Sequence, residues 1–455
     1  MTFRSTAEFG LNRVLRVDAR RANRYIAGDS AVPLYLPVTD STDNPSSGAT
    51  PTRIRPWSSL LLRDYRLIFI VILCGGTANH MRNVASLYQV YELSGSSMQL
   101  GLAGFFQALP SIVLGLFGGV LADTINRKKL IAITHGLNVL PGLALWLLTE
   151  TGHIQVWHVY TLSVIGGALQ TLGGPARQAI IPGLIPQSHL LNAVTLTTLM
   201  MQGSQLTAPV IAGFLIDASG VKTAYLIDAL LLIPSVIAVL FIHASGHPQG
   251  ARRQISWRSL VDGFEFLWHT RIILSLFLLD FFAVLFGFYR PILPIFAEDI
   301  FHVGARGLGA LYAAPAIGAL IGSGVLLAFG DIERKGAVAV IVTLLFALSL
   351  GFLGLSQSFL MGLLALGLLG VSDAISVAIR RTVVQILAPD NMRGRATSFL
   401  TVFAQTTNGL GAVIAGAGAA LFGAPNAALL GSLLCALTVV ATCWAIPQLW
   451  RYRPE

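Results

Sequence analysis

Gly-Gly-Val-Leu-Ala-Asp-Thr-Ile-Asn-Arg-Lys-Lys, residues 118 to 129, joins two long apolar blocks of the chain. Its glycines let neighbouring helices approach closely. Asp123 falls where the first block ends, and Arg127 and Lys128 can pair with it or cap the carbonyl groups of the preceding helix. The positive-inside rule alone would explain the basic residues of this joint, but it would not explain the two glycines and Asp123 at this spacing. We therefore predict a conformational switch at Gly119, Asp123, Arg127 and Lys128.

The same kind of apolar block recurs from Arg66 to the end of the chain. Of 455 residues, 54% are hydrophobic and 11% are charged, whereas a soluble domain carries about 25% charged residues. About 20 apolar residues cross a bilayer as a helix, and a helix satisfies its own backbone groups where water is absent. The sequence predicts an all-α membrane protein with twelve transmembrane helices, at residues 66–92, 98–122, 130–149, 155–176, 191–216, 222–243, 271–297, 305–329, 336–356, 358–379, 395–422 and 425–447.

The positive charge is distributed as in a membrane protein and not as in a nucleic-acid-binding protein, although the net charge is +9. Basic residues concentrate in the N-terminal tail and in every second joint between spans, as the positive-inside rule requires of cytoplasmic segments. We therefore expect a multi-pass protein of the cell membrane with both termini in the cytoplasm. The basic joint residues are Arg127, Lys128, Lys129, Arg177, Arg252, Arg253, Arg258, Arg271, Arg334, Lys335, Arg380, Arg381, Arg393 and Arg395.

The chain divides into two halves of six spans each. We predict a disordered basic and Pro-rich cytoplasmic tail at 1–56, six-helix bundles at 57–243 and 271–447, a cytoplasmic linker at 244–270, and a C-terminal tail at 448–455. Parallel six-helix repeats are typical of alternating-access transporters. The repeat is visible at an offset of 203 residues, which superposes Arg177 on Arg380, Pro186 on Pro389, Gln202 on Gln405, Gln205 on Asn408 and Gly213 on Gly416.

The 118–129 joint resembles the loop signature of the major facilitator superfamily, with Thr124 and Asn126 in place of an Arg and a Gly. A second resemblance lies at Ala208, Pro209 and Gly213, which are similar to the Gly-Pro core of the motif that marks exporters in that superfamily. A proline within a span frees a backbone carbonyl and allows bending. Close packing of two spans accounts for the same residues and does not exclude the functional interpretation.

Three further stretches, 89–96, 175–193 and 385–395, resemble the enterobactin-exporter-like branch, which includes drug and siderophore efflux proteins. The resemblance implies secondary active export of small amphiphilic compounds, with proton antiport. Many drug–proton antiporters carry an arginine motif in span four, and residues 158–170 contain no arginine. Of the properties that the resemblance implies, proton coupling is therefore the least supported.

Polar residues inside spans are costly and therefore indicate function or a stabilising pair. Asn79, Arg82, Asn83 and Ser86 form one helical stripe in the first span, which faces either an aqueous cavity or a polar network inside the bundle. Arg82 suits either an anionic substrate or a carboxylate partner.

The second half offers a different set of candidates. Asp280 is either a proton carrier or a fixed counter-charge, and Arg290 precedes a proline in the same span. Asp228 and Asp373 are further candidates, and His80 is a weaker one. The amides that either line the pathway or bond between helices are Gln170, Gln202, Gln205, Gln405 and Asn408.

Other classes of function lack their signatures in this sequence. No metal-ligand cluster, Gly-rich phosphate loop with Lys, or nucleophile–base pattern is visible, so we expect neither an enzyme nor a cofactor. The expected partners are a small-molecule substrate, protons and the lipid bilayer, with the protein acting as a monomer. An importer, a lipid flippase and a membrane sensor are the alternatives.

Overall fold

The structure is a computed structural model that describes residues 57–247, 265, 268, 270–330, 332–388 and 390–451. The predicted N-terminal tail and most of the predicted linker lie outside these residues. Throughout the described part, the regular secondary structure is helical. The long helices of the first half are α1 (Arg63–Ser94), α2 (Ser97–Thr124), α3 (Arg127–Glu150), α4 (Val156–Ala179), α5 (Leu190–Ser219) and α6 (Val221–Leu240).

The second half repeats this pattern with one interruption. Its long helices are α8 (Arg271–Gly287), α10 (Gly304–Phe329), α11 (Lys335–Leu355), α12 (Phe359–Leu387), α13 (Asp390–Phe422) and α14 (Ala424–Ala445). Short helical segments follow α8, namely η6 (Arg290–Ile292), α9 (Leu293–Ile295) and η7 (Phe296–Ile300), and α15 (Gln448–Arg451) comes last.

Ten helical segments of the described residues are long and apolar enough to cross a membrane. Large apolar side chains such as Leu140, Leu348 and Leu437 are exposed on the outside of these helices, where a soluble protein rarely shows a continuous apolar surface. The chain is therefore a multi-pass membrane protein. Neither α4 nor α13 is among these segments, so the count of twelve spans stays a prediction.

The span predicted at 271–297 is not one continuous helix. α8 ends at Gly287, and Phe288 takes an extended conformation with ψ of 106°. Pro291 lacks a backbone N–H and Pro294 follows it three residues later, so the helix cannot run through this stretch. The chain resumes as short 3₁₀, α and π turns up to Ile300. The stretch Arg271–Ile300 is still long and apolar enough to cross a membrane, but the predicted span is interrupted and is not one regular helix. The apolar composition continues through the break and gave no sign of it.

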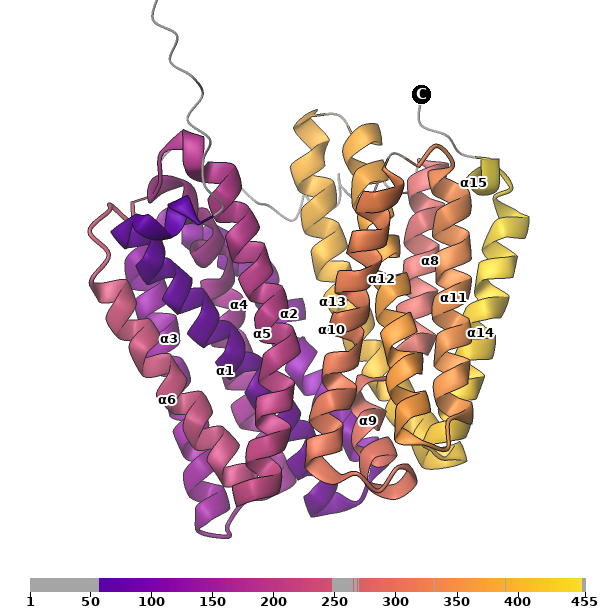
Figure 1. Cartoon of the computed structure of the whole chain (residues 1–455), viewed down its shortest axis with the longest axis horizontal. Helices are drawn as coiled ribbons and strands as arrows, with labels where there is room; N and C mark the ends of the chain where they lie inside the picture. The colour runs from indigo at the N-terminus through magenta and orange to yellow at the C-terminus, as the bar shows by residue number, and fades with distance from the viewer. Residues whose placement is uncertain are drawn as a thin grey trace, which may run out of the picture. The chain divides into compact units, whose positions relative to one another are not determined.

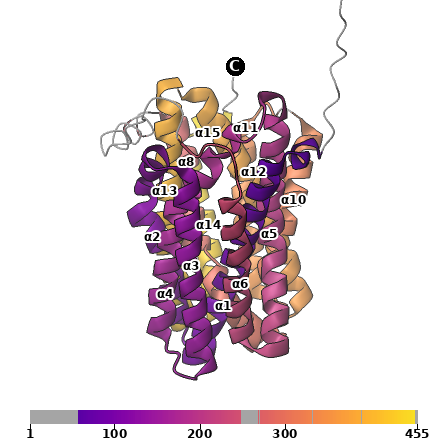
Figure 2. The same ribbon diagram turned by 90° about the vertical axis from the view of Figure 1, so that its left-hand side faces the viewer.

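The helices of each half pack mainly among themselves, as the two groups in Figure 1 show, and Figure 2 views them from the side of the first half. The halves meet along two crossings, α2 with α13 and α5 with α10. Both crossings depend on glycine. A Cβ on Gly101 would lie 2.8 Å from the carbonyl oxygen of Ala412, and one on Gly309 would lie 2.4 Å from that of Pro209. The backbones are therefore in direct contact.

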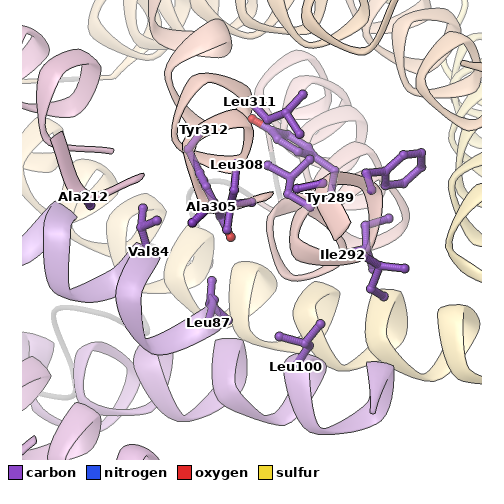
Figure 3. Packing of buried hydrophobic residues seen from close by; sticks show 14 of the residues in the cluster. Val84, Leu87, Leu100, Ala212, Tyr289, Ile292, Ala305, Leu308, Leu311 and Tyr312 are labelled. Carbon is purple, nitrogen blue, oxygen red and sulfur yellow. The ribbon is translucent and has the colours of Figure 1, made fainter. Parts of the chain in front are cut away.

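The buried apolar residues show at which end the halves join. The largest core contains Val84, Leu100 and Ala212 from the first half and Ile292 and Leu308 from the second (Figure 3). We call the end of the bundle where α1 begins and α14 ends the terminal end; the largest core lies at the opposite, far end. Near the termini each half has a separate core instead, one around Tyr65 and the other around Leu279. Within the described residues, the buried apolar cores thus join the halves at the far end, whereas at the other end each half keeps its own core.

Candidate substrate cavity

A cavity of about 530 Å³ lies between the halves, on the terminal side of the shared core. Its wall comes from both halves, which is the arrangement expected of a transporter that binds its substrate between two repeats. Its lining residues come from α1, α2 and α5 of the first half and from α8, η6, α10, α11, α12 and α13 of the second. We name this space the central cavity.

The ionised side chains that line the central cavity all belong to the second half. They are two carboxylates, Asp280 and Asp373, and two guanidinium groups, Arg290 and Arg380. Asp280 Oδ1 lies 2.5 Å from Arg380 Nη1, and the same nitrogen donates to Ser376 Oγ at 3.1 Å. Asp280 and Arg380 therefore compensate each other. Within the described residues, neither Asp373 nor Arg290 has an oppositely charged side chain within 4.0 Å.

The break after α8 positions Arg290 in the cavity wall. The hydroxyl of Tyr312 on α10 donates a hydrogen bond of 2.8 Å to the backbone oxygen of Arg290. This bond satisfies a carbonyl group at a point where the helical pattern is interrupted. Tyr289 and Tyr312 both belong to the apolar cluster drawn in Figure 3 and also line the cavity. Discontinuous helices at the centre of a transporter commonly form its binding site.

Uncharged polar side chains come from both halves. Asn83 and Gln205 line the cavity from the first half, and Gln405 and Asn408 line it from α13. Asn408 donates to Gln405 at 3.2 Å. Gln107, which the sequence analysis did not select, also lines the cavity, and its buried Nε2 has no hydrogen-bond partner. These amides can bond to polar groups of a bound compound.

Arg82 does not reach the central cavity, although it belongs to the polar stripe of the first span. Its guanidinium lies inside the first half, where Nε is 2.6 Å from Asp228 Oδ2 on α6. The two other nitrogens donate to Asn138 on α3, to Oδ1 at 2.7 Å and to the backbone oxygen at 3.0 Å. A Cβ on Gly166 would lie 2.6 Å from Arg82 Nη1, so the glycine makes room for the guanidinium.

The predicted stripe therefore divides between two environments. Asn83 faces the cavity, whereas Arg82 and Ser86 are buried in the bundle. Asn79, Gln170 and Gln202 are not among the cavity residues either.

Arg380 lies elsewhere than predicted from the sequence. It was assigned to a joint, but α12 continues to Leu387 and carries Arg380 within the helix. The repeat gave no warning, since Arg177, on which Arg380 superposes, was also assigned to a joint, and it too lies within a helix, α4. The aromatic residues Phe288 and Phe346, which line the cavity, gave no signal in the sequence because aromatic residues are common in every span.

The loop between α2 and α3 connects the ends of three helices. Arg127 donates to the backbone oxygens of Ala179, at 2.8 Å, and Ala122, at 3.2 Å. Lys128 donates to the backbone oxygen of Ile242 at the end of α6. Arg127 also lies 3.9 Å from Asp123, whose side chain is 34% exposed. Cations at the ends of helices offset the negative end of the helix dipole.

Asn126 begins α3 by accepting hydrogen bonds from the backbone nitrogens of Lys128 and Lys129. Of the loop glycines, Gly118 is buried against α4, where a Cβ would lie 2.5 Å from the backbone oxygen of Thr171, and Gly119 is half-buried.

The Pro-centred motif of α5 lies at the crossing with α10. A Cβ on Gly213 would lie 2.5 Å from the backbone oxygen of Ala305. Ala208 is fully buried, and Pro209 both contacts α10 and lines the central cavity. The motif therefore brings the two halves together at the far-end boundary of the cavity.

Polar contacts extend this closure to the far surface. Arg306 on α10 lies 2.9 Å from Asp217 on α5 and stacks over Phe214 at 5.2 Å. The hydroxyl of Tyr91 donates to Asp299.

Comparisons with known proteins agree with this architecture. The sequence model of the family described as "Transmembrane secretion effector" matches residues 54–450. Enterobactin exporter EntS of Shigella boydii serotype 18 is 27% identical over 352 residues, which cover 77% of this chain and 84% of that protein. EntS of Escherichia coli O81 gives the same identity and coverage.

Solved structures of transporters share the fold. The nucleoside transporter NupG matches with a TM-score of 0.64 at 14% identity, covering 86% of this chain and 100% of that one. A bacterial homologue of the human lysosomal transporter Spinster, in an inward-facing and unoccupied conformation, matches with a TM-score of 0.66 at 15% identity, covering 86% and 98%. The resemblance to the enterobactin-exporter-like branch is thereby confirmed. The chain belongs to the transmembrane secretion effector family of major facilitator transporters.

Proposed function

We propose that this protein exports small amphiphilic compounds from the cytoplasm by alternating access, in exchange for protons. The observation that carries the proposal is the central cavity, which both halves line and which the shared core of the described residues closes at the far end. The bias of basic residues towards the terminal end supports a cytoplasmic location for that end. On this basis the described conformation faces inward and is ready to receive a compound from the cytoplasm.

The lining of the cavity supports an amphiphilic cargo. Phe288, Tyr289, Tyr312 and Phe346 offer apolar and aromatic surface, whereas the amides offer hydrogen bonds. Arg290, without a carboxylate within 4.0 Å in the described residues, suits an anionic group of the cargo. The relatives named as exporters favour export over import or lipid flipping.

The loop between α2 and α3 supports the switching part of the proposal. Asp123 is partly exposed at the cytoplasmic end, and its ion-pair distance to Arg127 is long at 3.9 Å. In the outward-facing state the two halves must meet at this end, and Asp123 is then available to the second half. We propose that Asp123, with Arg127 and Lys128, latches that state.

Efflux of a fluorescent compound tests the proposed function. Cells that express the protein and are loaded with the anionic dye calcein should lose it faster than cells that express Arg290→Ala or no transporter. Lys222→Ala is a matched control, since Lys222 forms a surface pair with Glu150 far from the cavity. Dissipating the proton gradient with a protonophore should stop the efflux. Efflux that persists without the gradient would disprove proton exchange, and accumulation instead of loss would show import.

A further inference from the structure

Asp373 is a carboxylate that faces the central cavity and, among the described residues, has no cationic side chain within 4.0 Å. It lies on α12 together with Val377 and Arg380, at spacings of four and three residues, so that all three line the same wall. Its side chain is exposed in the cavity. No arginine, lysine or histidine nitrogen of the described residues lies within 4.0 Å of its oxygens.

Asp280 is in the opposite situation in the same cavity. Its contact with Arg380 is 2.5 Å, and its side chain is 25% exposed. Arg380 is held from a second direction by Ser376, at 3.1 Å. Releasing Asp280 to bind another cation would break the 2.5 Å contact that neutralises Arg380, which is unfavourable at membrane depth. Asp280 therefore acts as a counter-charge in this conformation.

The charged and titratable groups around Asp373 come from several helices. Among the described residues that line the cavity, Arg380 shares the helix of Asp373, Asp280 lies on α8, Arg290 on η6 and His80 on α1. The hydroxyls of Tyr289 and Tyr312 line the same cavity. Because Asp280 and Arg380 pair with each other, the carboxylate of Asp373 and the guanidinium of Arg290 remain, and these two groups lie more than 4.0 Å apart.

Alternating access gives the uncompensated carboxylate a role. In the open cavity water solvates Asp373, but each cycle closes the halves around the cavity. A carboxylate cannot be buried there without a proton or a cationic group. We propose that Asp373 takes up the single positive charge that enters the cavity in each cycle, and that Asp280 is the fixed counter-charge of Arg380. This assignment rests on the proposed export function and names the residue that performs the coupling.

Chemical labelling tests the assignment without requiring transport. Dicyclohexylcarbodiimide adds to protonated carboxyl groups at membrane depth, and peptide mass spectrometry of the full chain in liposomes locates the adduct. We expect the adduct on Asp373, roughly tenfold above that on Asp280, because only Asp280 is held by an arginine. Equal labelling of both residues, or absence of an adduct on Asp373 at every pH, would overturn the assignment.

The same experiment distinguishes the two sources of positive charge. Protection of Asp373 by ethidium, but not by the neutral compound chloramphenicol, identifies a cationic group of the cargo. Labelling that increases as the pH falls, without protection by ethidium, identifies the proton.

Transport in liposomes with an imposed pH gradient provides a second test. Asp373→Asn should lose the stimulation by the gradient, roughly tenfold for ethidium, because the carboxylate that binds the charge is gone. The double variant Asp280→Asn with Arg380→Gln should keep that stimulation, whatever its basal rate, because it removes a compensated pair. Stimulation that survives in Asp373→Asn and disappears in the double variant would reverse the assignment. A wild-type protein that carries neither probe would contradict the export function, while the labelling result would still decide the role of Asp373.

Discussion

The ion pair between Arg82 and Asp228 allows a test of how the first half is stabilised. The Asp228 side chain has no exposed surface and that of Arg82 is 6% exposed, so water does not screen the pair. Arg82 also makes two hydrogen bonds to Asn138. Together with the ion pair to Asp228, these bonds join α1, α3 and α6. Removing one partner of a buried pair costs about 3–5 kcal/mol, because the other charge stays buried without compensation. We predict a loss of about this size for Asp228→Asn.

The reverse substitution should cost less, and its cost should depend on pH. A carboxylic acid can become neutral by binding a proton, whereas an arginine in a protein stays charged. In Arg82→Gln the remaining Asp228 can therefore be buried as the neutral acid, and the variant should recover stability as the pH is lowered. Asp228→Asn, in which Arg82 keeps its charge, should show no such recovery. The neutral double variant, Arg82→Gln with Asp228→Asn, should be more stable than Asp228→Asn alone.

The free energy of unfolding can be measured by titrating the purified protein with SDS in mixed micelles, at neutral and acidic pH. Tryptophan fluorescence follows the transition. A loss below about 1 kcal/mol in Asp228→Asn, the value of an ordinary hydrogen bond, would show that the pair is not a buried charge pair of the expected strength. A double variant no more stable than Asp228→Asn would refute the reasoning from uncompensated charge.

Three further substitutions test the crossing, the break and the loop. Gly309→Ala places a Cβ 2.4 Å from a backbone oxygen of α5, so cysteine cross-linking of α5 to α10 should fall, whereas Gly324→Ala, with open space around it, should leave the yield unchanged. Tyr312→Phe removes the hydrogen bond to the backbone oxygen of Arg290, which is worth about 1 kcal/mol, and should weaken ethidium binding roughly fivefold in a fluorescence titration. Tyr160→Phe loses a similar hydrogen bond outside the cavity and should leave ethidium binding unchanged. Arg127→Ala loses two helix-end hydrogen bonds and should lower the free energy of unfolding by about 1–3 kcal/mol in the SDS titration; an unchanged value would show that these bonds do not stabilise the bundle.

Much of the helical architecture could be predicted from the sequence because it depends on local composition. Apolar length predicts helices, and the match of Arg177 with Arg380 reveals the repeat before any contact is known. The break after α8 could not be predicted in the same way. Apolar residues continue on both sides of Pro291, and the break is completed by a hydrogen bond from Tyr312, which lies 22 residues away. Contacts of this kind depend on tertiary packing.

The candidate site was less predictable because the same rule has two solutions. A charged side chain at membrane depth needs either a partner or water, and the sequence shows the charge but not which solution the fold supplies. Arg82 takes the first, because Asp228 and Asn138 surround it inside one bundle. Asp373 takes the second, because α12 turns it into a cavity that both halves line. Whether a polar residue finds a partner or water depends on the direction in which its helix face points. Arg82 and Asn83 are adjacent in sequence, yet Arg82 points into the first half and Asn83 points into the central cavity. A variant that moves a charge by one helical position should therefore exchange these roles, which composition alone would not anticipate.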